Sequence, residues 1–501
     1  MHIDSAIKTV SRNVIVNVAG AFWQFVLIII GTRLVLQQMG ADSFGLLALV
    51  GGTAGYFIYL DIGIGETVTK KVSETKDAEK LSRTVSTLFY FAAGFGLLLA
   101  LLTALFALFG IPALFSFAPS LMQSAVRMFL VIAAVLWLLY PLSMFAKVFV
   151  GLNRLDVYNA QRVIFQTLIL VMILAALRWH NSAEAAVVAI TLGGLLWKIT
   201  ALLTLRKMYP HIEINRRHFD PALLRGLLRY QSAATVSQAA GHTIYQCDIY
   251  MIGILLDPAS VALYSIANTI AMKLTEVSGV LGTAVFPMIS GFHGANMGDA
   301  VRKSFKLGTK LMAMALMPLV VFLFVYSEPV ITLWVGPAFL PAALALKWLL
   351  AAWFINAAAV VTSLTVKAVD RPGLEARIGA AVAVVNVALD YFFIVKYGFV
   401  GAVYATFITQ LIGFIALNAA VCRHLGLPSA PFLARLAGTA ALGALFGAVY
   451  LLPLPPWLFI VPLALHTALF LAAGYWLVLD AEERMLMGNM LRIVTGQGAG
   501  R

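Results

Sequence analysis

Apolar segments of about 20 residues recur along the whole chain, separated by short polar intervals. A segment of this length can cross the hydrocarbon core of a bilayer as one α-helix. The pattern therefore predicts an all-α polytopic membrane protein with about fourteen transmembrane helices. The predicted helices cover residues 14–36, 44–65, 85–109, 125–149, 157–177, 183–205, 232–256, 261–286, 307–327, 341–367, 376–395, 399–421, 433–452 and 457–479.

The composition agrees with this pattern, because 61% of the residues are hydrophobic and only 11% are charged. The net charge of +13 would suit a nucleic-acid partner in a soluble protein. Here the basic residues collect in every second polar interval, so roughly 28 of the 35 fall on one side of the membrane. That distribution is typical of cytoplasmic loops, predicts no nucleic-acid binding, and places both termini in the cytoplasm.

The sequence shows no signature of enzyme chemistry. It contains no P-loop, no HExxH motif, no nucleotide site and no Ser/His/Asp grouping, so no cofactor, metal or catalytic residue is predicted. The two cysteines, Cys247 and Cys422, lie in or beside apolar segments, and we expect buried thiols. The first apolar segment is expected to remain as a helix, since no signal-peptide cleavage pattern accompanies it.

A short internal echo predicts two repeated halves. Residues 40–47 and residues 257–264 each form a short outer turn followed by a small residue and a Leu or Tyr. The offset of about 217 residues spans six helices, which predicts parallel repeats about an axis along the membrane normal. The predicted domains are an N-terminal lobe at 1–205, a basic cytoplasmic linker at 206–231, a C-terminal lobe at 232–425, and two additional helices with a tail at 426–501.

Several short motifs follow one another at the predicted helix ends. They are Arg33, residues 39–46, residues 59–65, residues 151–154, residues 286–290 and residues 397–406. Together they span about residues 10–425 and resemble the polysaccharide transporter family, which includes O-antigen and exopolysaccharide flippases. That family belongs to the multidrug/oligosaccharidyl-lipid/polysaccharide exporter superfamily.

The resemblance implies two six-helix lobes around a central cavity, alternating access and up to two additional helices. It also implies a flippase in the bacterial inner membrane, acting in lipopolysaccharide or exopolysaccharide synthesis. Such a protein moves undecaprenyl-pyrophosphate-linked oligosaccharide from the cytoplasmic to the periplasmic leaflet. The implied partners are this substrate, membrane lipids, and a polysaccharide polymerase and chain-length proteins.

The hairpin at residues 241–276 carries the first group of candidate site residues. Lys273 lies about 13 residues, or roughly 20 Å, below the outer turn and is a candidate for binding pyrophosphate. Alternatively, Lys273 and Glu276 form a structural ion pair at i,i+3 spacing. His242 either shares this site or hydrogen-bonds to the backbone.

Acidic residues are candidates for ion coupling or gating. Desolvation raises the pKa of a carboxylate in a transporter cavity, so Asp248 could carry a coupling proton; alternatively, it closes a salt bridge between the lobes. Asp390, one turn from Asn386, and Glu276 raise the same question. Asp61 lies near the cytoplasmic end of its helix, where a gating salt bridge or plain solvation is expected.

Four further residues are candidates for lining the cavity. Arg33 either lines the cavity mouth or extends its charge to the headgroups. Gln24, Tyr56 and Asn356 are polar groups within helices that either contact sugar or form interhelical hydrogen bonds. For Lys198, extension to the headgroups is the expected role.

Three functions are compatible with these features. A lipid-linked oligosaccharide flippase predicts a cationic cavity, which Lys273 and Arg33 favour. A cation-coupled multidrug exporter of the same superfamily predicts an acidic cavity, which Asp248 and Asp390 favour. A membrane-bound polymerase or ligase ranks third, because no outer loop exceeds about 15 residues.

Overall fold

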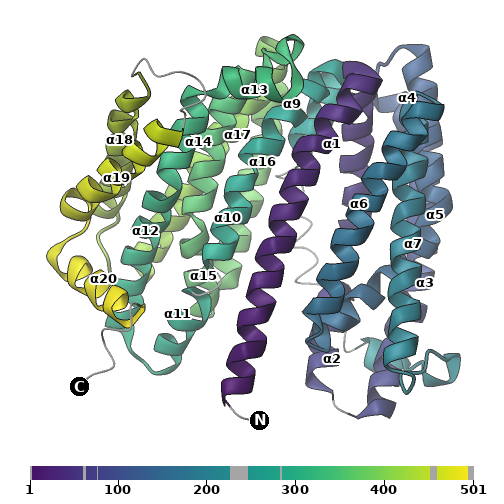
Figure 1. The fold of residues 1–501 in the computed structure, drawn as a ribbon, viewed down its shortest axis with the longest axis horizontal. Helices are drawn as coiled ribbons and strands as arrows, with labels where there is room; N and C mark the ends of the chain where they lie inside the picture. Colours follow the sequence, from purple (N-terminus) through teal and green to yellow (C-terminus); the bar gives the residue numbers. More distant parts are fainter. Residues whose placement is uncertain are drawn as a thin grey trace. The chain divides into compact units, whose positions relative to one another are not determined.

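The computed structural model describes residues 3–59, 64–75, 77–225, 246–282, 285–451 and 460–494, which form helices and short turns with no strand among them (Figure 1). The helices are α1 Ile3–Tyr59, α2 Ile64–Glu74, α3 Ala78–Leu105, α4 Ile111–Leu114, α5 Pro119–Gly151, α6 Leu155–Trp179, α7 Ala183–Met208, Gln246–Leu255, α9 Pro258–Ala271, α10 Lys273–Gly282, α11 Val285–Gly294, α12 Gly298–Val325, α13 Ser327–Val335, α14 Ala342–Ala358, α15 Val360–Ala368, α16 Pro372–Tyr397, α17 Phe399–His424, α18 Ser429–Phe446, α19 Ile460–Leu477 and α20 Ala481–Val494. A π-helical turn at Phe106–Gly110 joins α3 to α4.

The helices confirm the prediction of an all-α polytopic membrane protein. Among the described residues, ten helices are long and apolar enough to cross a membrane, and a bent pair formed by Pro258–Gly282 and Val285–Gly294 makes an eleventh. Two predicted helices, 14–36 and 44–65, are merged in α1, which kinks at Gly40. Gly40 has a φ of 76°, in the left-handed region that glycine adopts most readily.

Two features differ from the sequence prediction. The helix expected at 261–286 is interrupted at Met272, so α10 begins at Lys273. The short helices α2, α11, α13 and α20 were not predicted, because their 11, 10, 9 and 14 residues are fewer than a membrane span needs.

The chain divides into two compact units, unit 1 at Met1–Ala262 and unit 2 at Leu263–Arg501. In unit 1, a core of buried apolar side chains joins α2, α3, α5 and α7; Leu88, Phe145 and Phe149 are at most 1% exposed. In unit 2, α12 packs against α14, α18 and α19. Its Met314 and Met317 form a buried cluster with Phe470 of α19.

Part of the predicted linker packs against α3 within unit 1. The backbone N–H of Glu213 donates to Ser82 of α3 at 3.0 Å, and that of Asn215 donates to Ser86 at 3.1 Å. The same two hydroxyls donate in turn to backbone carbonyls of this segment. Extended backbone needs such partners when it has no strand beside it. The domain boundaries stay a prediction, since residues 226–245 lie outside the described part of the chain.

Candidate functional site

Three of the candidate residues with described side chains lie in unit 1. Gln24 and Arg33 are on α1, where Gln24 is half-buried and Arg33 is exposed. Asp248 is on the helix Gln246–Leu255 and is only 1% exposed. A carboxyl buried this deeply in an apolar helix is the residue type that transporters use for coupling or for a structural ion pair.

The remaining unit 1 candidates lie outside the described residues. His242 and Asp61 are among the positions that the structure leaves undescribed, and the same holds for the side chain of Tyr56. Their assignment to the cavity stays a prediction.

Lys273 and Glu276 come together in the first turn of α10, in unit 2. The Nζ of Lys273 donates to the carboxylate of Glu276. The Lys273 side chain is 20% exposed and that of Glu276 is 61% exposed. The interruption at Met272 therefore places Lys273 at the start of α10. The carboxylate that pairs with it, Glu276, is largely exposed.

Amide side chains connect the helices of unit 2. The indole Nε1 of Trp353 on α14 donates to Asn268 Oδ1 on α9 at 2.8 Å. The Nδ2 of Asn356, one turn further along α14, donates to Gln410 Oε1 on α17 at 3.1 Å. Asn356 thus makes the interhelical hydrogen bond that was the alternative to sugar contact.

The helix α17 carries further polar contacts. Asn386 Nδ2 on α16 donates to Thr409 Oγ1 at 3.4 Å, and Thr362 on α15 donates to Asn418 Oδ1 at 2.9 Å. Asp390, one turn beyond Asn386, is completely buried. Sequence reasoning missed Thr409, Gln410 and Asn418, because a single amide or hydroxyl in an apolar helix shows no partner until the fold supplies one.

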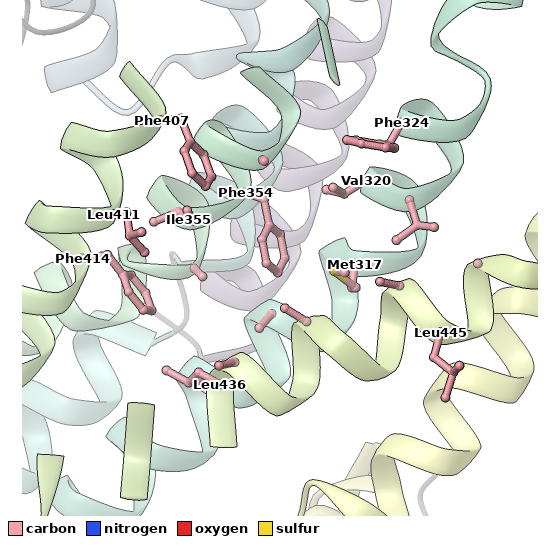
Figure 2. A pocket seen from close by; sticks show the side chains of 18 of the residues that line it. Met317, Val320, Phe324, Phe354, Ile355, Phe407, Leu411, Phe414, Leu436 and Leu445 are labelled. Carbon is pink, nitrogen blue, oxygen red and sulfur yellow. The ribbon is translucent and has the colours of Figure 1, made fainter. Parts of the chain in front are cut away.

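An apolar groove opens between α12, α14, α17 and α18 of unit 2, with a volume of about 1040 Å³. Figure 2 shows Phe407, Leu411 and Phe414 along one side and Val320 and Phe324 along another. All its lining residues are apolar, including Met317, Val320, Phe324, Phe354, Ile355, Phe407, Leu411, Phe414, Leu436 and Leu445. An ordinary ligand pocket carries a few polar groups that fix its ligand, so this groove suits a long hydrocarbon chain.

Comparison with known proteins places these features in one family. The family model of polysaccharide biosynthesis proteins matches residues 7–293, and the MatE family model matches residues 233–392. A putative O-antigen transporter of Shigella flexneri is 25% identical over 376 residues, which is 73% of this chain and 86% of the relative.

Two groups of solved structures share the fold. The lipid II flippase MurJ in an inward closed conformation has a TM-score of 0.72 and 16% identity, covering 91% of this chain and 99% of MurJ. An inward-facing multidrug resistance MATE transporter of the MOP superfamily has a TM-score of 0.69 and 15% identity. The match covers 80% of this chain and 95% of that transporter. The described helices therefore share the fold of these two transporters.

Proposed function

The chain belongs to the polysaccharide biosynthesis protein family, and we propose that it is a flippase for undecaprenyl-pyrophosphate-linked oligosaccharide repeat units. It moves them from the cytoplasmic to the periplasmic leaflet of the bacterial inner membrane by alternating access. Both termini are in the cytoplasm, as the distribution of Lys and Arg predicts.

The apolar groove of unit 2 is the observation that carries this proposal. A lipid-linked substrate has a long hydrocarbon chain that must stay in an apolar environment while its headgroup crosses the membrane. The side chains that line the groove are all apolar, and its volume of about 1040 Å³ is slightly above the roughly 300–1,000 Å³ of ordinary ligand sites. Its side chains offer no acidic group to balance the charge of a small cationic drug.

The polar residues predicted from the sequence complete the proposal. Lys273 meets the pyrophosphate, and it can exchange its contact with Glu276 for a contact with the substrate because Glu276 is largely exposed. Arg33, His242, Gln24, Tyr56 and Asn356 line the cavity for the sugars. Asp248, Glu276, Asp390 and Asp61 serve ion coupling or gating.

A multidrug exporter is the second candidate function. The match of the MatE family model to residues 233–392 favours it, as does the burial of Asp248 and Asp390. Buried carboxylates would attract a cationic drug or carry the coupling ion.

The two functions separate in cells depleted of this protein. A flippase predicts that undecaprenyl-pyrophosphate-linked oligosaccharide accumulates in the cytoplasmic leaflet, and that the wild-type gene relieves the accumulation. Lys273→Ala should fail to relieve it. Lys207→Ala, which removes an exposed lysine at the end of α7, is the matched control and should succeed. Absence of accumulation, together with altered sensitivity to cationic drugs, would contradict the flippase and support the exporter.

A further inference from the structure

Three cations gather where α5, α6 and α7 of unit 1 pack together. Lys147 Nζ on α5 lies 5.9 Å from the ring centroid of Tyr158 on α6, and Arg162 Cζ lies 5.9 Å from the same ring. Lys198 Nζ on α7 lies 3.6 Å from the ring centroid of Trp197. Lys147 is also close enough to Lys198 for their like charges to repel each other. We call Lys147, Arg162 and Lys198 the cation cluster.

No carboxylate in the described part of unit 1 balances this charge. Neither Lys147, Arg162 nor Lys198 has an ion pair there, and the nearby Asp156 is bound by Arg154 at 3.0 Å. Each aromatic face contributes only about 0.5–2 kcal/mol. An unbalanced cation within a membrane helix costs up to about 3 kcal/mol on insertion scales, the value at the helix centre, and three together repel one another as well. Among the residues that the structure describes, the cluster therefore lacks a balancing anion.

The structure holds one of these cations in place. Arg162 and Lys198 are half-buried, whereas Lys147 is exposed. The guanidinium of Arg162 lies against Gly20 of α1, where a Cβ atom would come within 2.8 Å of Nη2. The Nε of Arg162 is buried without a hydrogen-bond partner. A side chain that only extended to the headgroups would leave its guanidinium in water.

The depth of the cluster identifies the class of anion. Arg162 lies about 10 Å from the start of α6, and Lys198 lies about 15 Å from the end of α7, at the same end of the helix pair. The headgroup region of a bilayer is about 5–8 Å thick on each side, so with the helix ends at its outer edge these backbone positions lie about 3–10 Å inside the hydrocarbon. Long Lys and Arg side chains at this depth can reach the headgroup boundary, where the phosphates of membrane lipids are the concentrated anions.

We propose that Lys147, Arg162 and Lys198 form a binding site for the phosphate group of a membrane lipid on unit 1. The lipid is either an anionic phospholipid of the bilayer or a prenyl diphosphate; both present the same phosphate oxygens to the cations. Binding at this site does not depend on the flipping activity proposed above.

Native mass spectrometry of the purified full-length protein tests the site. The probes are phosphatidylglycerol, farnesyl diphosphate and, as a zwitterionic control, phosphatidylcholine. The variant Arg162→Gln/Lys198→Gln removes two charges of the cluster. The control Arg206→Gln/Lys207→Gln removes the same charge from exposed positions at the end of α7. Because each Lys or Arg near the membrane surface contributes about 1 kcal/mol, the cluster variant should bind phosphatidylglycerol, farnesyl diphosphate or both roughly tenfold more weakly.

The two anionic probes distinguish the sources of phosphate. Weaker binding of phosphatidylglycerol alone indicates a bilayer phospholipid, and weaker binding of farnesyl diphosphate indicates a prenyl diphosphate. Equal binding of both anionic probes by the cluster variant and its control overturns the proposal. If the double variant fails to purify, Lys147→Gln, at an exposed side chain, is measured with the same probes and the same outcomes. Since the readout is binding, a protein that fails to flip lipid still tests this site.

Discussion

At the scale of single residues, the most buried ion pair among the described residues of unit 2 joins Lys310 of α12 to Glu483 of α20. Lys310 Nζ donates to the two carboxylate oxygens at 2.6 and 2.8 Å, and the two side chains are 0% and 4% exposed. The carboxylate also accepts from the backbone N–H of Asp480 at 2.9 Å. The charges therefore satisfy each other out of contact with solvent.

Removal of one partner should cost far more than removal of both. We predict that Lys310→Met destabilises the protein by about 3–5 kcal/mol, because it leaves the carboxylate of Glu483 buried and unpaired. The double variant Lys310→Met/Glu483→Leu should recover most of that loss. Unfolding of the purified protein in detergent measures both free energies.

The control is Lys303→Met, which breaks a pair with Glu482 that is about half exposed on each side. It should change the free energy of unfolding by less than about 1 kcal/mol. If Lys310→Met were as mild as this control, the buried pair would carry none of the stability assigned to it.

Residue contacts also show what the sequence could and could not predict. Lys273 and Glu276 are three positions apart on a helix, so their ion pair was one of two stated alternatives. Lys310 lies in the predicted helix 307–327 and is completely buried, but its ion pair could not be predicted, because its partner Glu483 is 173 positions away. Local spacing predicts contacts within a helix, whereas contacts between distant helices depend on packing.

At the scale of helices, α1 and α9 approach each other closely within unit 1. A Cβ atom on Gly45 would lie only 1.6 Å from the carbonyl oxygen of Pro258, whereas a Cβ on Gly51 of the same helix would meet nothing within 4 Å. The two segments of the sequence echo, 40–47 and 257–264, thus touch at this point.

A matched pair of substitutions tests the approach. Gly45→Ala should lower the free energy of unfolding by about 1–3 kcal/mol, because backbone must move to admit the methyl group. Gly51→Ala should be neutral to within about 0.5 kcal/mol, or slightly stabilising through helix propensity. Thermal unfolding in detergent compares the two, and equal melting temperatures would show that α1 and α9 are further apart.

The docking of α20 should depend on pH through Asp480. Burial raises the pKa of this carboxyl. The hydrogen bond from the Glu483 N–H and the charges of Lys306, Lys310 and Arg435 together lower it by more, so the pKa of Asp480 lies below its ordinary value. A lowered pKa means that the carboxylate stabilises the folded form above about pH 4 and loses this effect as the pH falls through the folded pKa.

A spin label at Met485→Cys, an exposed position of α20, should therefore be less mobile at pH 7 than at pH 3. Asp480→Asn should raise the label's mobility at pH 7 and reduce its pH dependence. A label equally mobile at both pH values in the parent protein would contradict this role of Asp480.

Helix positions followed from hydropathy because membrane spans must be long and apolar. The described parts of the fourteen predicted segments are helical, apart from single turn or bend residues inside or at the ends of segments and the 3₁₀ turn at 447–451. The turn and bend residues are Leu256, Met272, Tyr326, Pro341, Ala359, Val478 and Leu479. The interruption before Lys273 could not be predicted, since neither Met272 nor its neighbours is a helix breaker. The groove could not be predicted either, because it forms between α12, α14, α17 and α18, and the sequence does not show how these helices pack.

At the scale of the whole molecule, the family resemblance drawn from motifs at helix ends is confirmed by the family match over residues 7–293. The fold is shared with MurJ and with a MATE transporter. The fold alone does not separate flippases from drug exporters, so the functional proposal depends on the groove and the cations.

Filling the groove should impair transport without unfolding the protein. Ala440 of α18 lines the groove, whereas its neighbour Ala441 is exposed and does not. We predict that Ala440→Trp lowers the transport rate several-fold by occupying space that the prenyl chain needs, and that Ala441→Trp leaves it within about twofold of the parent. The measurement is relief of lipid-linked oligosaccharide accumulation in depleted cells at matched protein levels, and equal relief by both variants would exclude the groove from the transport path.

The central claim is tested most directly in proteoliposomes that contain the purified protein and a fluorescent oligosaccharide on a prenyl diphosphate. A membrane-impermeant quencher reports how fast the labelled headgroup changes leaflet. The proposed flippase predicts exchange well above the rate of protein-free vesicles, and a lower rate for Lys273→Ala than for Lys207→Ala. Exchange at the rate of protein-free vesicles, from protein that is folded and correctly inserted, would contradict it.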